Sequence, residues 1–213
     1  MSFLTPVVHF FQAGGLFMYP IAVLLIMGAA IAIERLRFLA RSNRENRELW
    51  ARMVPLMNKH DYLGAEKIAV ASPSAMGKVI AYAFAHSRTT RQRAAVEMAI
   101  EESLMEVTSL LEKRTHYLAT FANVATLLGL LGTISGLIQA FAAIASLNLA
   151  EKTDVLSASI AEALNCTAFG LVTAVPLLLI HAWLTTRTGE MVDSVEMAST
   201  KFLNSLKLDL APA

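Results

Sequence analysis

The stretch LATFANVATLLGLLGTISGLIQAF, residues 118–141, decides the fold of this 213-residue chain. It lies in a segment that has no charged residue between Arg114 and Glu151. A helix needs roughly 20 apolar residues to cross a hydrocarbon layer of about 30 Å. The sequence therefore predicts a transmembrane helix over residues 118–141.

Two further segments predict the same structure. Residues 15–35 carry Pro20 in their first turns, where the missing backbone N–H costs least. Residues 156–184 are apolar except for one charged residue, Glu162. The whole chain is 55% hydrophobic and 16% charged, which is typical of a membrane protein rather than of a soluble domain. We therefore expect an all-α integral membrane protein with three transmembrane helices.

The basic residues predict how these helices are oriented. Fourteen of the 18 Lys and Arg residues lie between Arg35 and Arg114, one lies between the second and third spans, and three follow Thr186. Basic residues accumulate on the cytoplasmic side of a membrane. The expected organisation is an external N-terminal segment (1–14), a first span (15–35), a cytoplasmic helical domain (36–117), a second span (118–141), a short external loop (142–155), a third span (156–184) and a cytoplasmic C-terminal helix or tail (185–213).

The cytoplasmic segment has the pattern of packed helices. Apolar residues recur at helical spacing between residues 100 and 111, and again between 192 and 206. Ser72-Pro73-Ser74 predicts a helix break. The run 97–112 leads without Pro or Gly into the second span, so we expect one uninterrupted long helix there.

Glu162 is the first candidate for a functional residue. A carboxylate inside a span costs roughly 2.5 to 3.5 kcal/mol, so it usually faces protein or water instead of lipid. Counted along the helices, Glu162, Thr133 and Thr167 lie about 9, 12 and 16 Å below the outer edge of the membrane. We expect Glu162 to take part in ion passage or gating. The alternative is that Glu162 only reaches the outer interface or bonds a neighbouring subunit. A threonine hydroxyl in a span often bonds the carbonyl one turn back, so Thr133 and Thr167 taken alone are interpreted as structural.

Other small and polar residues lie near these three. Asn165 and Cys166 follow Glu162 by three and four residues, which places them on the same helix face. Thr126 precedes Thr133 by seven residues on one stripe of the second span. A polar strip could thus include Thr126, Asn165 and Cys166. Small residues at close spacing permit helices to approach each other, which is the interpretation for Gly129, Gly132 and Gly136.

No pattern in the sequence indicates catalysis. The chain has no GxxxxGK[ST] loop, no nucleotide-binding glycine fingerprint and no cluster of metal ligands. Cys166 is the single cysteine, so an intrachain disulfide is excluded. We expect a protein that is not an enzyme, with no catalytic residues, no cofactor and no metal.

The sequence resembles the MotA/TolQ/ExbB proton-channel family, and within it the ExbB/TolQ branch. The resemblance lies in LLGLLGTISGLIQAF (127–141), IAEALNCTAFGLVTAVP (160–176) and IERL (33–36). It implies a subunit of an inner-membrane ion-driven motor that couples proton flow to mechanical work on the cell envelope, as in TonB-dependent transport. It also implies a homopentamer around a dimer of a single-span ExbD/TolR-like partner, with Thr133, Glu162 and Thr167 facing the partner and the ion path.

Several alternatives remain open at this point. The chain could serve a Tol-Pal or gliding-motility motor, or it could be a non-conducting membrane scaffold. The MotA branch is less similar because its members have four spans. Asn165-Cys166 stands where small apolar residues are usual in relatives, and the sequence does not decide between protons and sodium. Expected further partners are membrane lipids and a TonB-like protein, but not nucleic acid.

Overall fold

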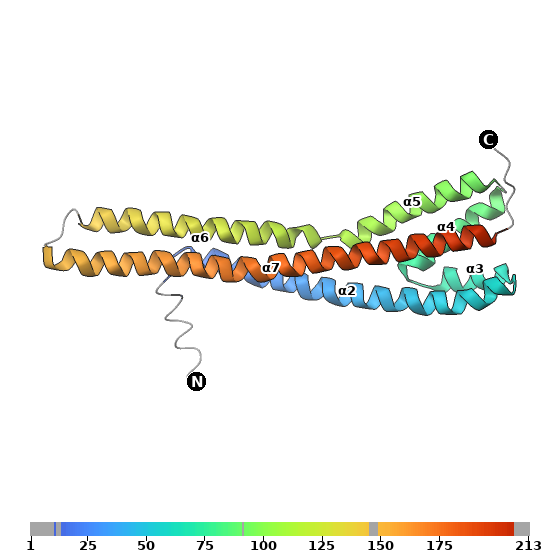
Figure 1. The fold of residues 1–213 in the computed structure, drawn as a ribbon, viewed down its shortest axis with the longest axis horizontal. Helices are drawn as coiled ribbons and strands as arrows, with labels where there is room; N and C mark the ends of the chain where they lie inside the picture. The colour runs from blue at the N-terminus through green and yellow to red at the C-terminus, as the bar shows by residue number, and fades with distance from the viewer. Residues whose placement is uncertain (1–10, 12–13, 91, 145–148, 207–213) are drawn as a thin grey trace, which may run out of the picture. The chain divides into compact units, whose positions relative to one another are not determined.

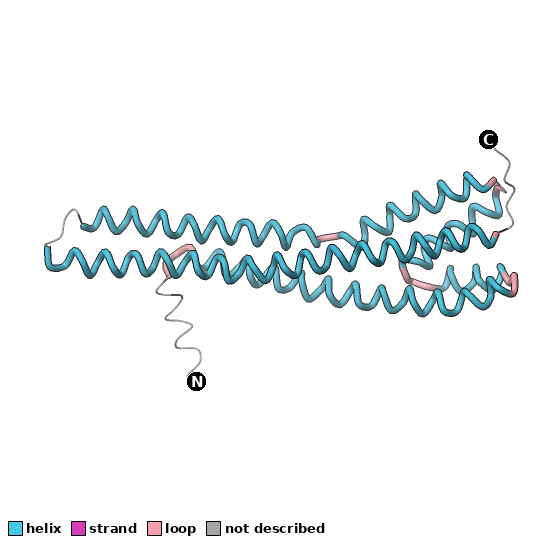
Figure 2. The backbone as a smooth tube through the Cα atoms, in the orientation of Figure 1, coloured by secondary structure: helices cyan, strands magenta, loops and turns pink. Residues whose placement is uncertain are grey.

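The computed structural model describes residues 11, 14–90, 92–144 and 149–206. Over these residues Figure 2 shows helices and loops and no strand, so the predicted all-helical class is confirmed. The helices labelled in Figure 1 are α2 (Met18–Asn58), α3 (Tyr62–Ala71), α4 (Ala75–Thr89), α5 (Arg93–Glu112), α6 (Thr115–Ile144) and α7 (Leu149–Ser205).

The chain divides into two compact units. The apolar unit comprises Met1–Ile33 and Arg114–Ala182, and the charged unit comprises Glu34–Lys113 and Trp183–Ala213. Only five of the 35 Asp, Glu, Lys and Arg residues of the sequence fall in the apolar unit. Helices α2 and α7 contribute residues to both units.

Within the described residues, two helical stretches are long and apolar enough to cross a membrane. They are Arg93–Ile144, which takes α5 and α6 together, and Lys152–Ser205 in α7. They contain the second and third predicted spans. The first predicted span, 15–35, is not one of the two, and the three-span arrangement with its orientation stays a prediction.

The connection between α5 and α6 differs from the expectation. An uninterrupted helix from 97 into the second span was the wrong prediction, because α5 ends at Glu112 and α6 begins at Thr115. Arg114 has a φ of 65°, in the left-handed region where a right-handed helix cannot continue. Arg35 of the charged unit is buried and donates a hydrogen bond to the carbonyl of Leu111. This cation satisfies one of the carbonyl groups that the end of α5 leaves without a helical partner.

The charged unit has an ordinary core of large side chains. The predicted break at Ser72-Pro73-Ser74 is confirmed, because α3 ends at Ala71 and Ser74 caps α4 by accepting a 3.0 Å bond from the amide of Gly77. Phe202 of α7 is fully buried and meets Phe84 edge to face, with ring centroids 4.5 Å apart. The helical pattern that begins at residue 192 lies in α7 up to Ser205.

Some predicted segments lie partly outside the described residues. The external N-terminal segment (1–14) is described only at Phe11 and Gly14, and the loop 142–155 lacks residues 145–148. The tail beyond Leu206 also lies outside them.

Candidate functional site

The apolar unit brings the backbones of α6 and α7 into contact. A Cβ atom added to Gly129 would lie 3.2 Å from Cα of Thr167, and one added to Gly170 would lie 2.8 Å from the carbonyl oxygen of Ala125. Gly136 lies against Ala163 of α7, where an added Cβ would be 2.9 Å from the Ala163 Cβ. The lack of side chains on these glycines is what permits such a close approach of the two helices.

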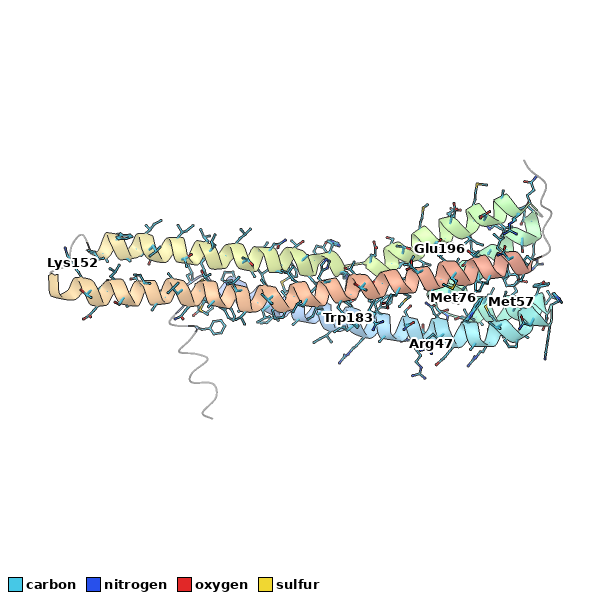
Figure 3. The ribbon with its side chains drawn as sticks, in the orientation of Figure 1. Arg47, Met57, Met76, Lys152, Trp183 and Glu196 are labelled. Atoms are coloured by element: carbon cyan, nitrogen blue, oxygen red, sulfur yellow. The ribbon has the colours of Figure 1, made fainter. Side chains whose placement is uncertain are left out.

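The outer surfaces of the same two helices are apolar. Figure 3 shows side chains projecting along the length of α6 and α7. Large apolar residues that are at least half exposed occur on both helices, among them Ile134, Ile138, Phe141, Leu164, Val172 and Leu179. Exposed apolar surface of this extent requires lipid or another protein against it.

The threonines of the predicted site make different hydrogen bonds. Thr167 of α7 donates to the carbonyl of Gly129 on α6 at 2.8 Å, so its hydroxyl links the two helices. Thr133 donates to Leu130 of its own helix at 2.6 Å, and Thr126 donates to Ala122 of its own helix at 3.1 Å. Thr133 and Thr167 are both half-buried. The hydroxyl of Thr167 thus links α6 with α7, whereas the hydroxyls of Thr126 and Thr133 bond within α6.

Glu162 lies on α7 with its side chain exposed along part of its surface. Its carboxylate packs against Gly15, just before α2, so closely that a Cβ on Gly15 would overlap Oε1 and lie 3.3 Å from Cδ. Glu162 is also the only charged residue between Asp154 and Arg187. One face of the carboxylate is therefore covered by backbone of the same chain.

The two residues that follow Glu162 on the same face are placed differently. Asn165 is half-buried. Cys166 is 1% exposed, and its Sγ occupies the space that a side chain on Gly132 would need. The sulfur of Cys166 therefore belongs to the α6–α7 contact, together with Gly129, Gly132 and Gly136.

Three further residues of this region were not predicted from the sequence. Gly170 lies at the closest α6–α7 approach, and small residues at 163, 166, 170 and 174 were the signal that could have identified it. Thr173 is fully buried, and its hydroxyl has no hydrogen-bond partner among the described residues. Gly15 contacts Glu162 although 147 positions separate them in the sequence, and no local pattern signals such a contact.

No metal site is visible in the part of the chain that the structure describes. Within it, no group of three or more His, Cys, Asp and Glu side chains comes together. The predicted site residues Thr133, Glu162, Asn165 and Thr167 carry a carboxylate, an amide and hydroxyls, which suit a proton or a partner side chain.

Comparison with known proteins agrees with this picture. The chain is 28% identical over 203 residues to a putative biopolymer transport protein ExbB homolog of Methanothermobacter thermautotrophicus, covering 92% of this chain and 71% of that protein. It is 35% identical over 94 residues to the Tol-Pal system protein TolQ of Haemophilus influenzae, covering 44% of this chain and 39% of TolQ. It is 40% identical over 65 residues to the biopolymer transport protein ExbB of Salmonella typhimurium, covering 30% and 26% respectively.

A model of one protein family matches most of the chain. The match covers residues 71–197, which include α4, α5, α6 and the greater part of α7. It contains the α6–α7 contact, Thr133, Glu162 and Thr167. This chain belongs to the MotA/TolQ/ExbB proton channel family, in its ExbB/TolQ branch.

Proposed function

We propose that this chain is the ExbB/TolQ-like subunit of an inner-membrane motor that couples proton flow to mechanical work on the cell envelope. It acts as a homopentamer around a dimer of a single-span ExbD/TolR-like partner. Each subunit crosses the membrane three times, with its N-terminus in the periplasm and its C-terminus in the cytoplasm. The chain performs no enzymatic reaction of its own, and membership of a proton channel family supports this proposal.

The observation that carries the proposal is the isolated charge of Glu162 in the apolar unit. An exposed carboxylate among apolar side chains is costly unless it meets protein groups or water. Gly15 covers one side of it, and Thr133 offers a half-buried hydroxyl on the neighbouring helix. A partner segment or a water-filled path against this side of α6 and α7 would supply the remaining contacts.

Aromatic and basic residues support the proposed boundaries of the spans. Trp183, labelled in Figure 3, directly follows the apolar part of α7 and is 48% exposed. The guanidinium of Arg187 lies 5.4 Å from its ring centroid. On α6, Tyr117 is exposed and stands three residues after Arg114. Exposed aromatic residues beside Lys or Arg are typical of the cytoplasmic membrane interface.

Ion flux through the complete complex tests the proposal. The chain would be co-expressed with an ExbD/TolR-like single-span protein, reconstituted into vesicles, and assayed for proton uptake under an imposed gradient. We expect flux in the wild-type complex and its loss in Glu162→Ala. Thr133→Ala and Thr167→Ala should also reduce flux.

Thr120→Ala is the matched control for the two threonine variants. Thr120 lies on α6 and donates to the carbonyl of His116 in its own helix at 3.3 Å, as Thr133 does to Leu130. It should leave flux unchanged. A complex that forms stably but carries no flux, with any imposed gradient, would instead identify the chain as a non-conducting scaffold.

A further inference from the structure

The short segment before α2 places the backbone of Gly15 against Glu162. Gly15 has a φ of 76°, a conformation that glycine adopts freely and other residues rarely do. All three atoms nearest to a Cβ built on Gly15 belong to Glu162, namely Oε1, Cδ and Cγ. Both the conformation and the contact therefore require glycine at this position.

This segment is held in place by contacts that do not involve Glu162. The ring of Phe11 meets that of Phe169 on α7 edge to face, with centroids 5.2 Å apart. Phe17 lies beside Gly132 of α6, with its Cβ 3.6 Å from the position of an added Cβ. Met18 and Ile21 are fully buried in a cluster with Ala125 and Cys166. The segment is thus anchored on α6 and α7 on both sides of Gly15.

We propose that Gly15 is a positioning residue for Glu162, which sets the direction of the carboxylate by covering one of its faces with backbone. The inference rests on the proposed ion-conducting function. Since the backbone of Gly15 is fixed, the carboxylate is confined to the remaining directions. A side chain at position 15 would displace Oε1 from the place where it receives or passes an ion. Any motion of the 14–17 segment relative to α7 would alter Glu162 as well.

A double-mutant cycle separates positioning from simple backbone strain. Gly15→Ala introduces backbone strain at positive φ with either Glu or Asp at position 162. It displaces the carboxylate only when residue 162 is the longer Glu. Flux would be compared for Gly15→Ala on the wild-type background and on a Glu162→Asp background, whose side chain is one methylene shorter. We expect Gly15→Ala to lower flux about tenfold on the wild-type background and about twofold or less on the Glu162→Asp background.

Leu16→Ala is the matched control in the same segment. Leu16 is 78% exposed, so removal of its side chain should leave the packing of the segment in place. Its effect should be small and the same on both backgrounds. An equal loss of flux for Gly15→Ala on the wild-type and Glu162→Asp backgrounds would overturn the proposal.

A second measurement does not depend on flux. In a Cys166→Ala background, Gly15→Cys and Glu162→Cys would be combined, and membranes would be treated with a mild oxidant. We expect an intramolecular disulfide, detected by mass spectrometry, and little of it for Gly14→Cys with Glu162→Cys. Failure of the first pair to form a disulfide would refute the contact. Absence of flux in the wild-type complex, with the disulfide formed, would refute the proposed function and leave the contact standing.

Discussion

The apolar unit and the charged unit hold their helices together in different ways. In the apolar unit the contact of α6 with α7 is made at glycines and small side chains, and Thr167 and His181 of α7 hydrogen-bond to carbonyls of α6. In the charged unit the core consists of large side chains such as Phe84 and Phe202. Its helix ends are tied by polar side chains, as where Asn46 accepts a 3.0 Å bond from the amide of Met76.

The difference follows from the surroundings of each unit. Lipid is as apolar as a contact between helices. Burying a large apolar side chain between helices therefore gains little free energy there. Close approach and hydrogen bonds then determine which helices associate. In water, by contrast, burial of large apolar side chains is the main stabilising contribution. The stability of the charged unit should consequently be most sensitive to removed side-chain volume, and that of the apolar unit to added volume.

Removal of volume should have its largest effect in the charged unit. Phe202→Ala is expected to lower the free energy of unfolding of this unit by about 3 to 5 kcal/mol, because it leaves a cavity beside Phe84. Hydrogen exchange of the amides of α4 and α7 measures the loss in the intact protein. Met197→Ala is the control, since Met197 is 59% exposed and its truncation should change little.

Addition of volume should have the next largest effect, in the apolar unit. Gly170→Ala places a methyl group 2.8 Å from the carbonyl oxygen of Ala125, and the two helices must move apart. We expect a loss of about 1 to 3 kcal/mol, measured as unfolding in detergent followed by circular dichroism. Gly189→Ala on the same helix meets no atom within 4 Å and should stabilise instead. Equal effects of both substitutions would contradict the close approach.

Loss of one hydroxyl should have a smaller effect that distinguishes two similar residues. Thr167→Val removes a bond between helices, which is worth about 0.6 and at most about 1.7 kcal/mol in membrane proteins. Thr133→Val removes a bond within its own helix and should be nearly neutral for stability. The same unfolding measurement applies to both variants. If the two variants lost equal stability, Thr167 would have no special role in holding α6 to α7.

A surface ion pair should give the smallest effect. Arg44 bonds Glu48 at 2.8 Å and holds the pKa of that carboxyl below its ordinary value. The stabilisation that this lowered pKa represents is present above the ordinary pKa and is lost as the pH falls through the lowered one. Arg44→Ala should return the pKa of Glu48 towards its ordinary value, as an NMR titration of the carboxyl carbon would show. Stability at neutral pH should hardly change, because the pair is exposed.

Local sequence patterns predicted the features that depend on neighbouring residues. The apolar stretches of α6 and α7, the break at Ser72-Pro73-Ser74 and the glycines at 129, 132 and 136 all have a signal within a few positions. The break at Lys113 and Arg114 had none, because neither residue is a typical helix breaker. It coincides with a hydrogen bond from Arg35, which is distant in the sequence, to the last turn of α5.

The sequence names the candidate site residues but does not show how differently each one is placed. Counting residues along the helices predicts similar membrane depths for Thr133 and Thr167. The same count does not indicate which of the two hydroxyls bonds to the neighbouring helix. The contact of Gly15 with Glu162 required the segment before α2 to lie against α7. Such a contact is set by tertiary packing around Phe11, Phe17 and Met18 rather than by any local preference.

The position of Cys166 allows the packing of the helices around it to be followed through the reactivity of its thiol. Its thiol is the only one in the sequence and lies shielded between α6 and α7, against Gly132. Met18 and Ile21 of α2 pack in the same cluster, so an alkylating reagent can reach the sulfur only when α2, α6 or α7 moves away from it. The rate of modification in the unaltered protein therefore measures how often this packing opens, and a comparison of resting and energised membranes tests whether the proposed working cycle includes such an opening.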